Sequence, residues 1–502
     1  PYDRETDLTY WEEDPEAAVK ALNNCYTYLG NMDEQLYSEA MTDNAYTKQP
    51  NDFTQNIGNG SYSTADSYVK QVWDGRYTGI RMCNQLLENI DRVPDLDPEL
   101  KKRYIGEAKV LRAYNYYELY TKFGDVPYTT KVLSIKESMS IARTAKATVI
   151  ANILADLDEV INGNYLPTSY DADNKGRITR WAAMAIKAKI YLFEGNWTQV
   201  KNITSTIMTE GGFKLFGSYA GLFEIANEYN SEVILDAQYR PTSREHQMMY
   251  VFLPPTLGGY SQLSPLQELV DSYIMLDGKT IKETGTSFDE SHPYANRDPR
   301  LKATVMYTGN SYTLADGTEV VINCEKGEGK DGYGVGSDCS ATGYYIKKYW
   351  DNAYRATLYS GLNPILIRYA DILLMNAEAL AELGELDKTA WDATIKPIRD
   401  RAGFTLASAV EFPEGASKDK LIEIVRNERR SELALEGHRH KDIIRWRIAD
   451  DVLNGWCHGL KTNEVVGTDN GYVRVENRAF NANKHYLWPI PQAERDLNGN
   501  LE

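Results

Sequence analysis

The sequence predicts an all-α fold in which paired antiparallel helices form a scaffold that carries a loop-rich, aromatic-rich insertion with few short strands. Residues 10–240 place apolar side chains at helical spacing between recognisable start and stop signals. Residues 241–366 change character and become rich in Gly, Tyr, Asn and Pro. Helical patterns resume after this stretch. We therefore divide the chain into residues 1–240, 241–366 and 367–502, and expect the first and third to pack as one globular unit.

The long helices of the N-terminal region are marked at their ends. Asp14-Pro15 is a helix start, with Asp as the cap and Pro at the first helical position, and it predicts a helix over Glu16–Leu29. A second helix is predicted over Ser67–Ile90. A third covers Pro98–Phe123, where Gly124 supplies the stop. The same reasoning predicts helices over Thr148–Ile161, Thr179–Phe193, Val200–Thr209 and Lys420–Leu435.

Two segments have the composition of helix–turn–helix pairs. Trp181–Thr209 and Arg368–Arg401 each alternate large apolar residues with Ala and place a Gly before the turn, Gly195 in the first and Gly384 in the second. Small residues let two antiparallel helices approach closely, which is the packing of tetratricopeptide (TPR) units. The spacing is irregular, so we predict TPR-like pairs within a helical scaffold in preference to a regular solenoid.

The insertion, residues 241–366, is where we expect a ligand to bind. Short β-like runs occur at Lys302–Tyr307 and Glu319–Asn323, and a further short strand is predicted at Tyr472–Glu476. Long loops on a rigid scaffold often carry function.

The charged block Arg426–Arg445 has two interpretations. Glu428, Glu432 and Glu436 recur every four residues, which places the three carboxylates on one helix face among several arginines. An acid/base catalytic site is one interpretation. We favour the other, an ion-pair network that holds this helix to its neighbours, because dense alternating charges neutralise one another.

Composition excludes some classes of function. Lys+Arg number 55 against 72 Asp+Glu, a formal net charge of −17, so nucleic acid is not an expected partner. No apolar run reaches the roughly 20 residues that span a bilayer. Tyrosine is abundant, with 36 residues, and it combines a flat apolar face with a hydroxyl group that suits the faces of sugars.

No motif for a metal, a cofactor or catalysis stands out. His438 and His440 form an HxH pattern without a third ligand cluster, and Gly327–Ser337 lacks the Lys-Ser/Thr end of a phosphate loop. The five cysteines form no CxxC pair, and a disulfide between Cys324 and Cys339 is left open. We therefore predict no cofactor, no metal and no enzymatic activity.

Aromatic residues in the insertion are better candidates for a binding site. Sugar rings present apolar C–H faces with a rim of hydroxyls, so a binder needs flat aromatic rings beside polar side chains. Burial of these rings beneath a long loop is the alternative for each of them. The predicted glycan-binding residues from this region are Tyr260, Tyr294, Tyr345, Trp350 and Arg355.

Four C-terminal stretches, taken together, resemble the SusD/RagB family of outer-membrane nutrient-binding lipoproteins. They are Ile367–Glu385, Ile395–Phe404, Val425–Trp446 and His485–Leu501, and the block Ala108–Phe123 followed by GDVPY adds to the resemblance. The resemblance implies an all-α fold with TPR-like units and a cell-surface protein that captures oligosaccharides or polysaccharides. It also implies delivery to a SusC-like TonB-dependent transporter, and attachment to the outer membrane through an N-terminal lipid anchor that this chain does not contain.

The resemblance implies a second candidate site. In the family the loop after the first helix often carries an acidic residue that contacts ligand, and Thr42-Asp43-Asn44 is similar to it. An aromatic residue near the start of the following long helix serves as a stacking platform in some members, and Trp73 matches that place with Arg76 one turn later. Asp43, Asn44, Trp73 and Arg76 are therefore predicted to bind glycan, with packing of Trp73 in the scaffold as the alternative.

Three other functions are kept open. A peptide-binding lid of the RagB type and a TPR protein-interaction scaffold both suit paired helices, whose concave faces bind extended segments. A glycoside hydrolase needs only two suitably placed carboxylates, and acidic residues are plentiful here.

Overall fold

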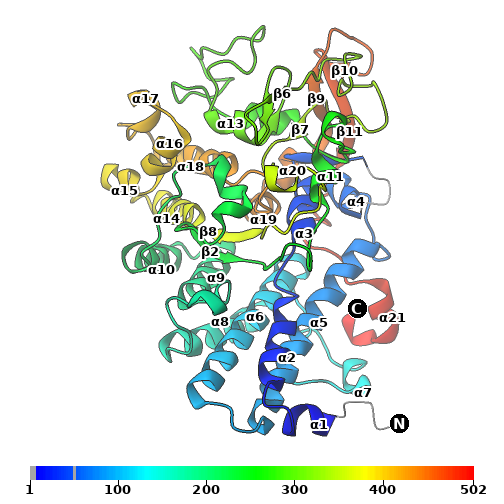
Figure 1. Cartoon of the computed structure of the whole chain (residues 1–502), viewed down its shortest axis with the longest axis vertical. Helices are drawn as coiled ribbons and strands as arrows, with labels where there is room; N and C mark the ends of the chain where they lie inside the picture. The colour runs from blue at the N-terminus through cyan, green and yellow to red at the C-terminus, as the bar shows by residue number, and fades with distance from the viewer. Residues whose placement is uncertain (1–6, 49–52) are drawn as a thin grey trace. The chain divides into compact units, whose positions relative to one another are not determined.

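Local helix signals place most of the long helices where the sequence predicts them. The computed structural model describes residues 7–48 and 53–502, and it confirms a predominantly helical fold with short strands (Figure 1). Helix α6 runs over Pro98–Phe123 as predicted, because Asp97 caps it, Pro98 occupies its first position and Gly124 ends it at φ 73°. Helix α5 covers Ser67–Asn89 and is capped by Asp66.

The chain forms two compact units, and each is assembled from segments that are discontinuous in sequence. Unit 1 comprises residues 1–30, 62–194 and 483–502, and unit 2 comprises residues 31–61 and 195–482. The helices of unit 1 are α1 (Asp7–Glu12), α2 (Ala17–Tyr26), α5, α6, α7 (Ile135–Ser138), α8 (Lys146–Asn162), α9 (Arg180–Phe193) and α21 (Gln492–Leu497).

Helix α6 is the centre of unit 1. It packs against α2, α5, α8 and α9, and from Tyr104 onward it is buried on nearly every side. A helix surrounded by others must satisfy its polar side chains internally. Glu107 does so by accepting hydrogen bonds from Tyr26 (2.6 Å) and Arg177 (3.1 Å).

Unit 2 contains the remaining helices and all of the strands. Its helices are α3 (Met32–Tyr37), α4 (Phe53–Asn59), α10 (Trp197–Glu210), α11 (Met248–Phe252), α12 (Gln267–Ser272), α13 (Pro299–Thr304), α14 (Tyr369–Leu383), α15 (Lys388–Ala393), α16 (Ile395–Ala402), α17 (Ala407–Val410), α18 (Lys418–Glu432), α19 (Arg439–Arg445) and α20 (Ala449–Val452).

A row of three helices, α10, α14 and α18, is the framework of unit 2. Helix α14 packs against α10 on one side and α18 on the other. Its buried alanines, Ala370, Ala377 and Ala381, allow the close approach predicted for TPR-like pairs. Asn376 crosses to α10 and donates to Thr204 at 2.9 Å. Gly384 ends α14 at φ 74°, a left-handed conformation that only glycine adopts without strain.

The strands are short and pair in antiparallel fashion. Their bounds are β1 (Ala45–Thr47), β2 (Val233–Asp236), β3 (Leu263–Pro265), β4 (Val305–Met306), β5 (Ser311–Thr313), β6 (Glu319–Val321), β7 (Tyr345–Ile346), β8 (Ile365–Arg368), β9 (Asn454–Lys461), β10 (Thr468–Asp469) and β11 (Tyr472–Ala479). Strands β10, β11 and β9 form a three-stranded sheet in that order; the pairs are β1–β3, β2–β8, β4–β7 and β5–β6.

Three local predictions are corrected. Lys302–Tyr307 is not a strand, because Pro299 starts the helix α13, which continues to Thr304 before the two-residue strand β4. Helix α18 ends at Glu432, so Glu436 lies beyond the helix that carries Glu428. All five cysteines are free thiols, and that of Cys339 donates to the Lys330 carbonyl oxygen at 3.3 Å.

Candidate functional site

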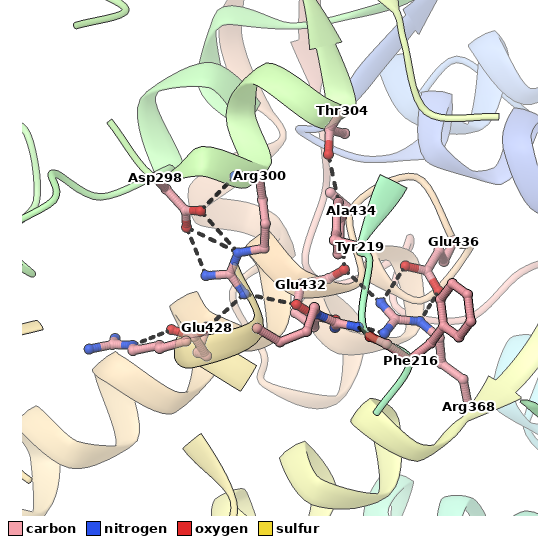
Figure 2. A network of polar contacts seen from close by, with 12 residues as sticks. Phe216, Tyr219, Asp298, Arg300, Thr304, Arg368, Glu428, Glu432, Ala434 and Glu436 are labelled. Atoms are coloured by element: carbon pink, nitrogen blue, oxygen red, sulfur yellow. Dashed lines mark hydrogen bonds and ion pairs between the residues drawn. The ribbon is translucent and has the colours of Figure 1, made fainter. Parts of the chain in front are cut away.

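The charged block predicted from the sequence forms a buried ion-pair network in unit 2 (Figure 2). Arg300 contacts Asp298 at 2.7 Å, Glu428 at 2.7 Å and Glu432 at 2.9 Å. Arg368 contacts Glu432 and Glu436, each at 2.7 Å. Figure 2 shows the two guanidinium groups on either side of Glu432, which joins them.

The network extends to further elements. Glu232, at the start of β2, receives Arg368 at 2.7 Å and Arg401 at 3.1 Å. Arg399 donates from Nε to Glu428 at 2.7 Å, and Lys348 contacts Glu436 at 2.6 Å. The network therefore joins β2, β8, α13, α16 and α18 through charged side chains inside the protein.

Its electrostatics fit a structural role. Burial alone would raise the pKa of Glu432, but the guanidinium groups of Arg401, Arg368 and Arg300 together lower it well below the usual range. The pKa values of Glu428 and Glu436 are also lowered by neighbouring arginines in spite of burial. These carboxylates stay ionised and fully paired, whereas a general acid needs a pKa raised toward neutrality. The ion-pair interpretation of the block fits this geometry.

Two of the predicted ligand residues, Asp43 and Asn44, are structural. Asp43 is 4% exposed and forms a bidentate pair with Arg439, with both N–O distances at 2.8 Å. Asn44 donates to Glu39 at 2.8 Å and accepts from Arg430 at 2.9 Å. Both side chains are committed inside unit 2, so they do not present a surface to a ligand in this conformation.

Trp73 and Arg76 are buried within unit 1. The ring of Trp73 is 3% exposed and packs edge-on against Phe123, with ring centroids 5.0 Å apart, and at 4.8 Å from Tyr77. Arg76 donates to the Tyr28 carbonyl oxygen at 3.0 Å. Trp73 therefore packs within the helical scaffold, which was the alternative considered for it. A ring enclosed by other rings cannot stack on a sugar in this conformation.

The candidates from the insertion differ in exposure. Tyr345 is fully buried and donates its hydroxyl to the carbonyl oxygen of Asp331. Tyr294 is half-buried, with its ring stacked on Tyr307 at 4.0 Å. Trp350 and Arg355 are also half-buried, and Trp350 donates to the Thr313 carbonyl oxygen at 3.2 Å.

Tyr260 belongs to an exposed aromatic surface that the sequence analysis did not find. Its ring stacks on that of Tyr250 at a centroid distance of 5.6 Å and an interplanar angle of 16°. The ring of Tyr359 meets Tyr250 edge-on at 5.9 Å. Tyr260 is 47% and Tyr359 40% exposed, and Tyr250 lies half-buried between them. We call Tyr250, Tyr260 and Tyr359 the tyrosine platform.

The backbone fixes the position of each ring. Tyr250 is on α11, and the chain turns back so that the Tyr260 amide donates to the Tyr250 carbonyl oxygen at 2.7 Å. The turn requires Gly259, because a Cβ atom there would lie 2.1 Å from the Leu253 carbonyl oxygen. Tyr359 follows Leu358, whose side chain is 5% exposed in the core.

A short arginine hairpin, residues 240–244, lies beside the platform. Arg240 and Arg244 exchange backbone hydrogen bonds at 2.9 Å, and both side chains are exposed. The hairpin packs directly on the segment after Tyr359, because a Cβ atom on Gly361 would lie 2.6 Å from the Pro241 nitrogen. The hairpin therefore places two exposed arginines on the segment that adjoins Tyr359. Sequence patterns could not reveal the tyrosine platform, because Tyr250 and Tyr359 are 109 positions apart and neither belongs to a motif.

The described residues contain neither a metal-binding cluster nor a membrane-spanning helix. Among residues 7–48 and 53–502, no group of three or more His, Cys, Asp or Glu side chains is arranged to hold a metal ion. No helix in these residues combines the length and apolarity that crossing a bilayer requires.

Two family models together match most of the chain. The model described as "SusD family" matches residues 222–502, more than half of the sequence. The chain belongs to the SusD family. A second model, described as "Starch-binding associating with outer membrane", matches residues 16–192.

Individual SusD family proteins are similar over nearly their whole length. SusD-like protein P25 of Formosa agariphila is 27% identical, covering 88% of each chain. The crystal structure of a SusD-like carbohydrate binding protein from Bacteroides fragilis is 28% identical, with a TM-score of 0.86 over 98% of this chain and 100% of that one. A laminarin binding SusD-like protein shares the fold at 24% identity and a TM-score of 0.70, covering 96% and 97% of the two chains.

Proposed function

We propose that this SusD family protein binds oligosaccharide or polysaccharide at the cell surface through the tyrosine platform, without chemical change to the glycan. The single observation that carries the proposal is the exposed arrangement of Tyr250, Tyr260 and Tyr359. The similar protein from Bacteroides fragilis is a SusD-like carbohydrate binding protein, and the family model that matches residues 16–192 is described as starch-binding. Both support the same class of ligand.

The physical basis of binding is stacking combined with hydrogen bonding. An aromatic face gains from contact with the apolar C–H face of a sugar ring, and two rings at nearly a right angle can hold successive sugar units of a bent chain. Arg240, Arg244 and the exposed Gln247 supply donors to the hydroxyl rim. Few side chains are involved, so binding is expected in the roughly micromolar to millimolar range.

We propose that the half-buried candidates make additional contacts to a longer glycan. Tyr294, Trp350 and Arg355 each expose part of a side chain in the insertion. Contacts to a longer glycan are proposed there, subordinate to the platform because the rings of Tyr294 and Trp350 already pack on Tyr307 and Tyr312.

Delivery to a transporter is the second part of the proposed function. Attachment to the outer membrane by an N-terminal lipid anchor would hold the protein beside a SusC-like TonB-dependent barrel. Confinement there raises the effective concentration of captured glycan at the pore without any new contact. The description of the N-terminal family model as associating with the outer membrane supports this location. Purification of the anchored protein from its own membranes tests this part: we expect a barrel transporter to accompany it, and soluble partners alone would contradict it.

Affinity electrophoresis tests the binding proposal directly. The protein is run through gels that contain soluble starch, laminarin or a uronic-acid polysaccharide, and retardation in at least one is expected. Tyr260→Ala should lose that retardation, whereas Tyr229→Ala is the matched control, because Tyr229 is 39% exposed but its hydroxyl donates to Gln238 at 2.6 Å. Equal retardation of Tyr260→Ala and the unaltered protein would remove the platform from the proposal. Release of shorter oligosaccharides during incubation would instead indicate a hydrolase.

A further inference from the structure

Two cysteines of unit 1 face each other across a helix pair. Cys25 lies on α2 and Cys83 on α5, and both side chains are fully buried. Helices α2 and α5 pack against each other. The thiol of Cys25 donates to the Ala21 carbonyl oxygen at 3.3 Å, and the thiol of Cys83 is near enough to raise the pKa of the Cys25 thiol.

Contacts on either side of the pair establish the register of the two helices. The Asn24 amide nitrogen lies 3.1 Å from the Met82 sulfur. Beyond the end of α2, Tyr28 meets α5 near Gly79, where a Cβ atom would lie 2.8 Å from the Tyr28 Cβ. Positions thus rise along α2 as they fall along α5, so the segments are antiparallel. Each cysteine is the next residue after one partner of the Asn24–Met82 contact, Cys25 after Asn24 and Cys83 after Met82. The glycine, one turn from Cys83, lets the two backbones approach closely at this point.

We propose that Cys25 and Cys83 form an intramolecular disulfide when the chain folds in the presence of a disulfide donor. The two thiols lose two protons and two electrons, and a bond forms between their sulfur atoms. The donor, a small-molecule disulfide or the disulfide of a thiol–disulfide oxidoreductase, accepts the electrons and leaves as two thiols after a mixed-disulfide intermediate.

Burial determines when this bond can form. The neighbouring thiol of Cys83 and burial both raise the pKa of the Cys25 thiol, and the thiolate is the species that attacks a disulfide. In the folded, reduced protein both thiols are also closed to a donor. The bond therefore forms during folding, before α2 packs on α5, and the folded protein keeps whichever state it acquired.

The disulfide would close a loop that contains the segment contributed to unit 2. The chain leaves unit 1 after Gly30, contributes residues 31–61 to unit 2, and returns at Tyr62. A link between positions 25 and 83 joins the helices that precede and follow this excursion. Because a cross-link restricts the unfolded chain, unit 1 should gain stability in the oxidised state.

Refolding of the full chain tests the proposal. The protein is unfolded with dithiothreitol, refolded with glutathione disulfide and glutathione, then denatured, alkylated and mapped by mass spectrometry. We expect three of the five cysteines to be alkylated and one peptide pair to link Cys25 to Cys83, with the link lost on reduction. Five alkylated cysteines, or a link between Cys324 and Cys339 in its place, would overturn the proposal.

Variants supply a second readout. The protein refolded with glutathione disulfide should have a Tm roughly 5–10 °C higher than the protein refolded in dithiothreitol. Cys324→Ala, which removes a buried thiol outside the pair, should keep this shift, whereas Cys83→Ala should abolish it. If Cys83→Ala does not fold, the mass map of the unaltered protein alone decides. The result does not depend on glycan binding, so it can fail while the proposed function stands.

Discussion

Arg368 forms a bidentate ion pair with Glu436: Nε lies 2.7 Å from Oε2 and Nη2 lies 2.7 Å from Oε1. The same guanidinium also reaches Glu432 and Glu232, each at 2.7 Å. One buried side chain thereby ties the C-terminal end of β8 to the C-terminal end of α18.

Replacing Arg368 should therefore be costly. In Arg368→Met three buried carboxylates lose their shared partner, and removal of one member of a buried ion-pair network typically costs about 3–5 kcal/mol of unfolding free energy. Chemical denaturation followed by circular dichroism measures it. Arg474→Met, which breaks an exposed pair with Asp469, is the control and should leave the transition unmoved. Equal stability of the Arg368→Met protein would contradict the structural role of the network.

Acid should weaken unit 2 through the same carboxylates. The folded pKa values of Glu428, Glu432 and Glu436 lie below the ordinary value of 4.5. Groups with a lowered folded pKa contribute stability above the unfolded pKa and lose it as pH falls toward the folded pKa. The free energy of unfolding should therefore decrease steadily below about pH 4.5. Urea titrations at a series of pH values check this, and a flat profile down to pH 3 would refute it.

Two other buried carboxyl groups make the protein less stable as the pH rises. Burial raises the pKa of Glu39 and of Asp236 to about 7. Their folded forms bind protons more tightly than the unfolded chain, so they favour folding at low pH and this benefit is lost as pH rises through about 7. Because this loss begins at the unfolded pKa of about 4 and the stability lost in acid is regained by about pH 4.5, stability should peak near pH 4.5. In Asp236→Leu, the free energy of unfolding should fall less steeply with pH above the peak. An unchanged slope would show that Asp236 does not cause the decline.

A variant of Trp73 distinguishes a structural role of this residue from a ligand-binding role. Trp73→Ala removes a ring enclosed by Tyr77 and Phe123 and should cost about 3–5 kcal/mol. Trp456→Ala is the matched control, since that ring is 44% exposed. Thermal unfolding of both variants provides the comparison. A Trp73→Ala protein that melts normally but no longer binds glycan would restore the original prediction for this residue.

Variants of the tyrosine platform should differ in glycan affinity according to whether they keep the aromatic ring. Tyr260→Phe keeps the ring face and should retain most affinity, whereas Tyr260→Ala and Tyr359→Ala should each weaken binding about 5- to 20-fold. Calorimetry with the oligosaccharide selected by affinity electrophoresis measures both. Melting temperatures should remain unchanged because these rings are largely exposed. If Phe and Ala variants lose affinity equally, the hydroxyl, and not the ring face, makes the contact.

Sequence alone could locate the helices whose signals are local. Helix α6 is bounded by Asp97, Pro98 and Gly124, which lie next to the residues they affect. Pro397 also acts locally, because it lies in the first turn of α16, where the amide hydrogen that proline lacks would have no partner within the helix. The family resemblance rested on such local stretches, and the family model confirms it.

The candidate site was harder to predict because exposure depends on distant partners. Asp43 is hidden by Arg439, 396 positions later, and Tyr345 by the loop that contains Asp331. Tyr250 and Tyr359 carry no sequence signal beyond being tyrosines. Composition drew attention to tyrosine and to residues 241–366, but side-chain packing decides which rings reach solvent.

The Tyr250–Tyr260 turn is held by main-chain hydrogen bonds and by Gly259, not by the tyrosine rings themselves. Residues 250, 260 and 359 can therefore be exchanged while the supporting backbone keeps its course. A lineage could thus change the ligand preference of the proposed site by few substitutions, with the buried ion-pair network left intact.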